Sequence, residues 1–284
     1  MIKPIILYAV FMPGMFSATL AQEATPCDER VIRHRDWKES SKTEWHLRIR
    51  SSGKGELLYF GTQHVDEPAH AQFKEIRNQW ESFKPTVALF EGPDRGVTGT
   101  AEETISRFGE SGYVRFLAKQ AGIKTMTLEP EFADTYAYLI SHFPQNQVDI
   151  YMMAKEAMRL RTRKGYSKDQ LVAELNKMLP MIQKMIAPAK LSINSVEELE
   201  RDFKKYWGTL EWYQAPQEWF DPLKRSSETG GIFTNEINTL SSDYRDVHMY
   251  RKLADLANKG EKVFAVVGRN HVPLQAPALK CAIK

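Results

Sequence analysis

Cysteines and long apolar runs are both scarce in this sequence. The 284 residues include 2 cysteines, and no C-x-x-C motif is present. H-E-x-x-H, G-x-S-x-G and P-loop motifs are also missing, which leaves the zincin, α/β-hydrolase and nucleotide-binding classes without support. After residue 21, no segment is apolar for long enough to span a bilayer. We therefore expect no membrane span in the mature chain.

No strong excess of either charge is present. The chain carries 39 Lys and Arg against 36 Asp and Glu, a net charge of +3 at pH 7. This balance excludes the strongly basic class of nucleic-acid-binding proteins, and we expect no nucleic-acid partner. Hydrophobic residues make up 42% of the chain, which is ample for one large domain or for a domain with a sizeable insertion.

Residues 1–21 have the composition of a secretory signal peptide. Lys3 is followed by an apolar run at residues 5–16 and then by small residues up to Ala21, the order that such signals show. The alternative is a buried N-terminal helix. We predict that the signal is removed and that the protein is exported, to the periplasm or out of the cell.

The two cysteines, Cys27 and Cys281, lie near the two ends of the predicted mature chain. In an oxidising compartment an even pair of cysteines favours a disulfide, and we predict one here. Two unrelated free thiols are the alternative, because sequence alone does not show that the two residues are close in space.

Two similar segments near the ends of the sequence indicate buried strands. An apolar run ends in the motif G-x-x-H at residues 61–64, and a second run ends in the same motif at residues 268–271. Continuous apolar runs suit parallel strands that are covered on both faces, and glycine allows a sharp turn. We expect His64 and His271 at the carboxyl ends of their strands, where open α/β sheets gather ligands and catalytic groups.

Two further predicted strands end in carboxylates. Residues 86–90 lead to Glu91, and residues 123–128 lead to Glu129. The residues between them, about 101–121, have a helical pattern and would supply the right-handed crossover that parallel neighbours require. Strands that end in His, Glu, Glu and His predict a polar site at one edge of the sheet. The alternative is a structural network of buried polar groups.

Local patterns around the first buried strand predict an edge strand and a helix. Residues 45–50 alternate apolar and polar side chains, which suits an edge strand paired with residues 57–60. Residues 66–68 offer an N-cap, an acidic first turn and a proline at a first helical position. A helix is expected from there to about residue 83. Its apolar face would consist of Phe73, Ile76, Trp80 and Phe83.

These patterns together predict an α/β fold with a mostly parallel central sheet flanked by helices. The sheet domain would be built from both ends of the chain, with residues 22–131 as its N-terminal half and residues 259–284 as the strand that completes it. Residues 132–258 read as a helical insertion or cap. Aromatic residues concentrate at positions 206–220 within this insertion, either as core between cap and sheet or as a wall for an extended substrate.

The two G-x-x-H motifs, with a strand ending at Glu91 between them, resemble the TraB/GumN/Tiki family within the ChaN and erythromycin-esterase-like superfamily. The resemblance spans residues 56–273 and is densest at the two ends. It implies a metal-dependent hydrolase of the peptidase type, in which His64, Glu91 and His271 hold a divalent metal ion. Such an ion lowers the pKa of its bound water to about 7 and polarises a carbonyl group.

The resemblance also implies supporting residues for the cleavage of a peptide or protein substrate. Glu67 or Glu129 would act as general base. Arg245 matches a family position that reads Arg-Asn and would stabilise an oxyanion or a carboxylate. Asp246 follows it here in place of asparagine, which departs from the family pattern.

Other branches of the superfamily give two further readings. The ChaN branch implies a haem-binding or ligand-binding protein, and the erythromycin-esterase branch implies ester hydrolysis. The esterase branch more often has glutamate in its first motif, where this chain has Thr62. Two more histidines, His70 and His248, fall in helical stretches and are expected at the surface or beside the ligands.

Overall fold

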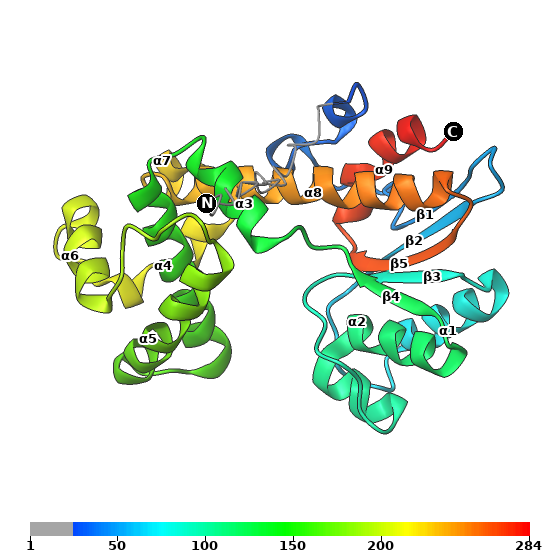
Figure 1. The fold of residues 1–284 in the computed structure, drawn as a ribbon, viewed down its shortest axis with the longest axis horizontal. Coiled ribbons are helices and arrows are strands. Elements are labelled where there is room, and N and C mark those ends of the chain that lie inside the picture. Colours follow the sequence, from blue (N-terminus) through cyan, green and yellow to red (C-terminus); the bar gives the residue numbers. More distant parts are fainter. Residues whose placement is uncertain (1–24) are drawn as a thin grey trace, which may run out of the picture.

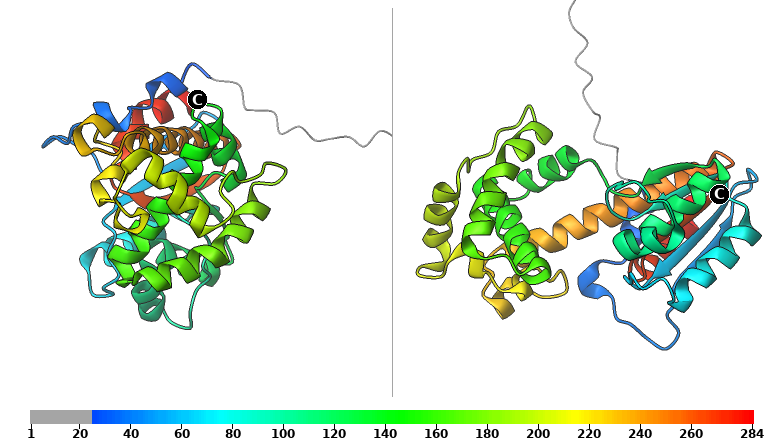
Figure 2. Two further views of the ribbon diagram at one scale, coloured as in Figure 1. Left: turned by 90° about the vertical axis from the view of Figure 1, so that its left-hand side faces the viewer. Right: turned by 90° about the horizontal axis from the view of Figure 1, so that it is seen from below.

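The computed structural model describes residues 25–284, so the predicted signal peptide at residues 1–21 lies outside the described residues. The chain folds as an α/β protein, as predicted. A five-stranded sheet with its helices lies beside a lobe made of helices, and the long helix α8 (Thr234–Asn258) runs from one to the other (Figures 1 and 2).

The sheet has the order β1-β2-β5-β3-β4. Its strands are β1 (His46–Arg50), β2 (Glu56–Thr62), β3 (Val87–Phe90), β4 (Lys124–Thr127) and β5 (Lys262–Gly268). β1 pairs antiparallel with β2, and the other neighbours are parallel. Because β5 lies between β2 and β3, the sheet is built from both ends of the chain. The carboxyl ends of β2, β5, β3 and β4 therefore face the same edge.

Burial along each strand follows its place in the sheet. Every residue of β2 and β3 is buried, as are the last six residues of β5. In the edge strand β1, exposed residues alternate with more buried ones, and the residues of the edge strand β4 are partly or fully exposed. The continuous apolar runs in the sequence thus mark the three central strands, which helices cover on both faces.

Two helices cover one face of the sheet and two cover the other (Figure 1). The first pair is α1 (Ala71–Phe83) and α2 (Ala101–Ala121); the second is α9 (His271–Ala282) and the later part of α8. The four residues predicted to form the apolar face of α1 are all buried. However, α1 begins at Ala71 and not at residues 66–68, because the ring of His70 caps it by accepting from the backbone N–H of Gln72.

The C-terminal segment contains more than the predicted strand. Residues 259–284 were predicted to complete the sheet with a strand, which is β5, and α9 follows β5 directly and starts at His271. Its buried side chains, among them Val272 and Leu279, pack against the sheet. The sequence does not predict this helix, because Pro277 lies inside it and its first turn has no acidic residue.

The helical lobe has a core of its own. It contains α3 (Phe132–Ile140), α4 (Gln145–Lys164), α5 (Lys168–Met185), α6 (Val196–Trp207), the 3-10 turns η3 (Trp212–Gln214) and η4 (Gln217–Phe220), and α7 (Ser226–Thr229). Trp212, Trp219 and Phe220 are buried in this core, so these members of the aromatic cluster pack the lobe. Within residues 25–284, no helix is both long and apolar enough to cross a bilayer.

Helix α8 belongs to both cores. Ile237, near its start, is buried in the helical lobe, whereas Met249 and Leu253 are buried against the sheet. The residues between these two contact regions, around positions 243–246, lie where the helix passes the carboxyl edge of the sheet. This position explains how a helix of the predicted insertion delivers side chains to the strand ends.

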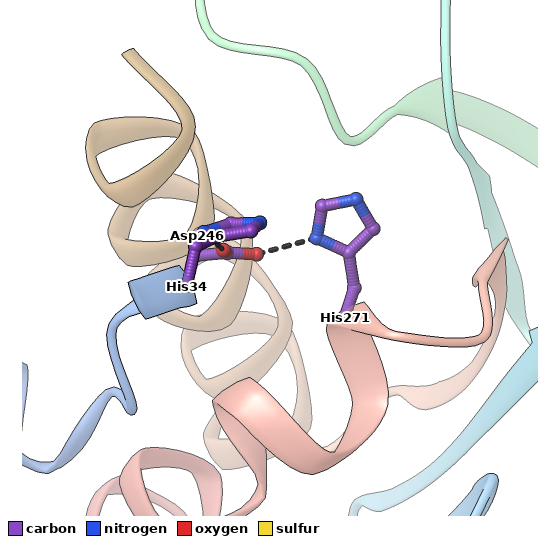
Figure 3. A group of neighbouring side chains, drawn as sticks. All are labelled: His34, Asp246 and His271. Carbon is purple, nitrogen blue, oxygen red and sulfur yellow. Dashed lines mark hydrogen bonds and ion pairs between the residues drawn. The ribbon is translucent and has the colours of Figure 1, made fainter. Parts of the chain in front are cut away.

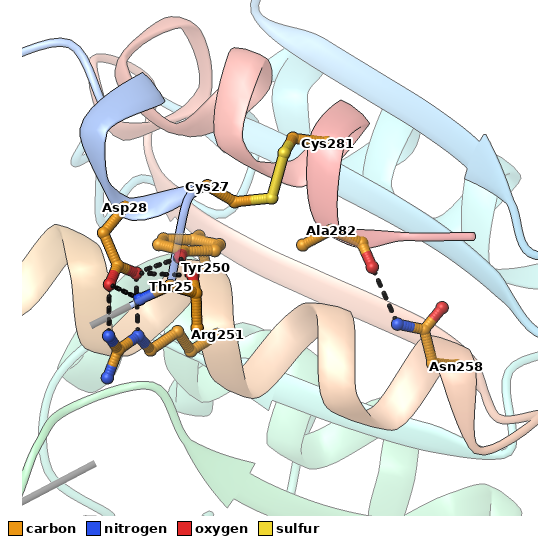
Figure 4. Close-up of a disulfide and its surroundings, with 8 residues drawn as sticks. All are labelled: Thr25, Cys27, Asp28, Tyr250, Arg251, Asn258, Cys281 and Ala282. Carbon is orange, nitrogen blue, oxygen red and sulfur yellow. Dashed lines mark hydrogen bonds and ion pairs between the residues drawn. A yellow bond between two sulfur atoms is a disulfide. The ribbon is translucent and has the colours of Figure 1, made fainter. Parts of the chain in front are cut away.

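The first described residues, 25–45, form an N-terminal arm that includes η1 (Asp28–Arg30) and η2 (His34–Asp36). The predicted disulfide is present: Cys27 and Cys281 are bonded, with their Cα atoms 5.7 Å apart, and the bond ties the arm to α9 (Figure 4). Asp28 accepts hydrogen bonds from Tyr250 and Arg251 of α8. The arm is thus fastened to both helices on its face of the sheet.

Candidate active site at the carboxyl edge of the sheet

The predicted strand-end residues meet at one edge of the sheet. Glu91 follows β3, Glu129 lies two residues after β4, and His64 lies two residues after β2. His271 is the first residue of α9, three residues after β5. Arg245 reaches the same place from the middle of α8. These five residues come from five different elements and form a cluster of opposite charges.

Arg245 lies at the centre of the cluster. It donates to Glu129 Oε2 at 2.6 Å and to Glu129 Oε1 at 2.5 Å, and it donates to Glu91 Oε1 at 2.7 Å. Its Nη1 lies 3.3 Å from Nε2 of His271. One guanidinium therefore contacts three of the other predicted residues, using the planar fork of donors that suits carboxylates.

Glu91 is held as a carboxylate. Burial alone would raise its pKa, but the positive charges of Arg245 and His271 and two hydrogen bonds outweigh burial and lower the pKa to about 2. The second of these bonds comes from the backbone N–H of Gly268 to Oε2, at 2.5 Å. Glu91 is thus ionised and fixed at neutral pH, as a metal ligand or an electrostatic anchor requires.

His64 is paired with a carboxylate that the motifs did not indicate. Its Nδ1 lies 2.6 Å from Oε1 of Glu110, and this contact raises the pKa of His64. Glu110 reaches His64 because α2 is broken at Gly109, whose φ of 60° is strained for any residue with a side chain. The His64 side chain is 67% exposed, and because Nδ1 is engaged by Glu110, Nε2 is the nitrogen left for a ligand.

Both motif glycines are required by close approach. A Cβ on Gly61 would lie 2.5 Å from the carbonyl oxygen of Trp45. A Cβ on Gly268 would lie 2.9 Å from Nε2 of His64 and 3.2 Å from Oε2 of Glu91. Neither glycine has a positive φ, so their role is to leave space and not, as expected, to turn the chain. At Gly268 that space is bordered by His64 and Glu91, two of the predicted metal ligands.

His271 is paired with Asp246 (Figure 3). The Nδ1 of His271 lies 2.5 Å from Oδ1 of Asp246, and Gln275 donates to the same oxygen at 2.6 Å. Burial acts to lower the pKa of His271, but the charge of Asp246 outweighs it and the net effect raises this pKa. Gln275 is fixed in turn by the hydroxyl of Tyr59, at 3.1 Å.

The ring of His34, from the N-terminal arm, also approaches Asp246, at its other carboxylate oxygen (Figure 3). Its Nδ1 lies 3.4 Å from Oδ2 of Asp246 and 3.3 Å from Oδ1 of Asp243. One ligand atom from each of His34, Asp246 and His271 can be chosen so that all lie within 4.8 Å of one another, so these three residues could hold a metal ion. The predicted ligands His64, Glu91 and His271 do not form such a group as their side chains stand, and their assignment stays a prediction.

Three of the other predicted residues lie away from this centre. Glu67 is exposed, and no hydrogen bond or ion pair within residues 25–284 joins its carboxylate to the cluster. His70 is the N-cap of α1. His248 is half-buried on α8, where Nε2 has no hydrogen-bond partner in the described chain. The general-base role of Glu67 stays a prediction.

Sequence reasoning missed Glu110, Asp246 and His34. Glu110 lies within α2 and Asp246 within α8, where no motif marks them, and His34 lies in an arm without regular pattern. Position 246 did give a signal, because the aspartate there departs from the asparagine that the sequence resemblance predicts. Comparisons with protein-family models, with curated proteins and with solved structures found no match for this chain.

Proposed function

We propose that this protein is an exported, metal-dependent hydrolase that cleaves peptides. The observation that supports the proposal most strongly is the meeting of His64, Glu91, Arg245 and His271 at one sheet edge, although they are far apart in the sequence. A polar cluster at the carboxyl ends of parallel strands is the usual place for catalysis in α/β folds, and strongly shifted pKa values in such a cluster favour a functional role over a structural one.

The chemistry of the predicted ligands suits a divalent cation, although their side chains as they stand are not within 4.8 Å of one another. The donor set of two imidazoles and a carboxylate is one that catalytic zinc and related ions use. Each imidazole has its Nδ1 against a carboxylate, Glu110 for His64 and Asp246 for His271. This second contact is typical of metal-ligating histidines, because it fixes the ring and leaves Nε2 to bind the metal.

The ligands would be His64, Glu91 and His271, of which His64 Nε2 and Glu91 Oε2 both approach Gly268 closely. A bound divalent ion supplies a water molecule of lowered pKa and polarises the scissile carbonyl. Arg245 provides a fixed positive charge for the oxyanion that forms during amide cleavage. Both oxygens of Glu129 accept from Arg245, so Glu129 orients the guanidinium.

The disulfide supports the exported location. Disulfides persist in oxidising compartments and are rare in the cytosol, and Cys27 and Cys281 are bonded here. Removal of residues 1–21 would leave Cys27 in the mature chain. The proposal of export therefore rests on this bond together with the composition of the N-terminal segment.

The test is metal analysis of the purified mature protein alongside a digest of a peptide library. We expect stoichiometric metal, and we expect peptide cleavage that a chelator stops and a divalent ion restores. The matched variant is Glu91→Gln, which keeps the size of the side chain but removes the charge. Metal-free protein that cleaves nothing, with or without added ions, would contradict the proposal. A haem absorption band on adding haem would support the ligand-binding alternative.

One observation favours a second candidate, an esterase that needs no metal. Arg245 already places a cation between Glu91 and His271, and the exposed His64 has Glu110 behind it to hold the Nδ1 proton. In this reading, Nε2 of His64 takes the proton from an attacking water, and Arg245 stabilises the oxyanion. Hydrolysis of a simple ester that persists in chelator and is lost in the Glu110→Gln variant would favour this candidate.

A further inference from the structure

We propose that His34 is a positioning residue of the site: it supports Oδ2 of Asp246 while Oδ1 of the same carboxylate holds Nδ1 of His271, so that Nε2 of His271 stays directed into the strand-end cluster. This inference rests on the proposed function in one respect, because it takes His271 as a working residue of the site. His34 comes from the N-terminal arm, which carries no family motif.

The first support is an unpaired buried oxygen. Asp246 is fully buried. Its Oδ1 accepts from His271 and Gln275, whereas Oδ2 has no hydrogen-bond partner within residues 25–284. A buried carboxylate oxygen without a donor is costly. The His34 ring approaches this oxygen, with Nδ1 3.4 Å from Oδ2 of Asp246 and 3.3 Å from Oδ1 of Asp243, so a small movement of the ring toward Asp246 makes the missing hydrogen bond.

The second support is the tautomer of His271. An arginine has no acceptor, so the 3.3 Å contact between Arg245 Nη1 and His271 Nε2 requires Nε2 to accept. In the neutral ring the proton must then be on Nδ1, where it is donated to Asp246. This arrangement disfavours a metal ion between His34, Asp246 and His271, because a metal on Nδ1 would force a proton onto Nε2, against Arg245.

The third support is a set of contacts that hold the N-terminal arm against α8 and α9. The backbone N–H of Ile32 donates to the carbonyl of Leu274 in α9 at 2.9 Å. The backbone N–H of His34 donates to Asp243 in α8 at 3.3 Å, and Arg33 makes an ion pair with the same carboxylate at 3.1 Å. The arm therefore holds the helix that carries Asp246 and the helix that begins with His271. Its His34 ring lies edge-on to His271, with centroids 6.2 Å apart.

The test is NMR of the folded, oxidised protein with 15N-labelled histidine, at a pH at which the His271 ring is neutral. The chain has 7 histidines, so single variants assign every ring. We expect His271 to show the Nδ1–H form with a strongly hydrogen-bonded proton. His34→Ala should convert this signal to a mixture of tautomers, whereas His34→Asn should preserve it because the asparagine amide can place an N–H near the position of Nδ1. The matched control, His142→Ala, removes an exposed ring and should change nothing.

An unchanged His271 signal in a folded His34→Ala protein would overturn the inference. So would zinc added to the apo protein, if it removes the Nδ1–H signal and shifts His34 and His271 together, because these three residues would then be a metal site. Circular dichroism and thiol titration of each variant would confirm that the fold and the disulfide persist. A variant that fails either check is replaced by His34→Gln, read in the same way.

The activity assay separates this inference from the proposed function. With a cleavable peptide, His34→Ala should lower kcat about 10-fold, the lower end of the cost of losing a direct partner of a working histidine, because His34 acts through Asp246, while KM changes little. If the wild-type protein cleaves no peptide, the proposed function fails, but the NMR result still decides whether His34 positions His271. A kcat unchanged by His34→Ala in an active enzyme would contradict the inference alone.

Discussion

Arg245 donates to Glu91 at 2.7 Å, although 154 residues separate them in the sequence. The contact joins the middle of α8 to the end of β3. Because α8 is buried at one end in the helical lobe and at the other against the sheet, this pair connects the two parts of the molecule at the candidate site. Movement of α8 would shift the central cation of the cluster.

The first prediction concerns this cation. Arg245→Met leaves the carboxylates of Glu91 and Glu129 without their shared partner, so we expect a loss of about 10²- to 10³-fold in kcat. Loss of a partly buried ion pair should also lower the free energy of unfolding by up to about 3 kcal/mol. Kinetics and urea denaturation measure the two effects. The control is Arg107→Met, which removes an exposed pair with Glu103; equal losses in both variants would contradict a special role for Arg245.

The strand-end residues could be predicted from the sequence because each signal is local. An apolar run, a glycine or a carboxylate, and the rule that parallel strands share an edge place His64, Glu91 and His271 together. The helical segment between Glu129 and His271 could also be predicted, because its apolar residues recur at helical spacing. These features need no knowledge of how the helices pack.

The partners of the histidines could not be predicted, because they depend on packing between distant elements. Glu110 reaches His64 only through the break in α2 at Gly109. Asp246 faces His271 because α8 passes the strand ends at that residue. His34 depends on the course of an arm that has no regular pattern and is fixed by contacts to α8 and α9.

The second prediction concerns the disulfide. Cys27 and Cys281 are 254 residues apart in the sequence, and the chain-entropy model gives about 5 kcal/mol of stabilisation for closing so long a loop. We expect the double variant Cys27→Ser, Cys281→Ser to have a lower urea midpoint than the wild type, and the wild type in reductant to approach the same midpoint. Equal midpoints for oxidised and reduced wild type would show that the bond adds nothing to stability.

The third prediction concerns the pH dependence of the arm. Burial acts to raise the pKa of Asp28, but hydrogen bonds from Arg251 and Tyr250 outweigh it and lower the pKa from 3.8 to about 2. A depressed pKa means that Asp28 stabilises the fold fully above pH 3.8 and loses this contribution as the pH falls toward 2. Because the site is partly solvated, we expect the contribution to be about 1 kcal/mol.

Asp28→Asn tests this linkage. The variant should be less stable than the wild type at pH 6, and the difference should shrink between pH 4 and pH 2 when unfolding is followed by urea titration at each pH. A matched control is Asp255→Asn, since Asp255 is exposed in an i,i+4 pair with Lys259. A constant difference at every pH would show that the charge of Asp28 is not the stabilising feature.

The fourth prediction separates core from substrate wall in the aromatic cluster. Trp212 is 1% exposed in the core of the helical lobe, and its Nε1 has no hydrogen-bond partner in the described chain. Trp212→Ala should therefore cost about 3–5 kcal/mol in unfolding free energy. Trp212→Phe should cost much less, because no hydrogen bond is lost. Both variants, if folded, should keep the cleavage pattern of the wild type. An altered pattern would indicate that this aromatic contacts substrate.

The last prediction concerns His64 and His271, which we expect to act as one unit. Both have Nδ1 fixed by a carboxylate, and both adjoin Glu91: His64 across the space at Gly268, and His271 with Nε2 3.9 Å from Oε1. If they share a metal ion, the loss of either removes nearly all activity and most of the metal. The double alanine variant should then be hardly worse than either single variant, because losses within one unit are not additive.

Folding should largely survive the loss of His64, whose side chain is exposed, and His271→Asn should be used beside His271→Ala because the latter leaves Asp246 buried without its main partner. Activity, metal content and circular dichroism are measured on all variants. Independent losses, with the double variant worse than either single one by the product of their factors, would show that the two histidines serve different functions.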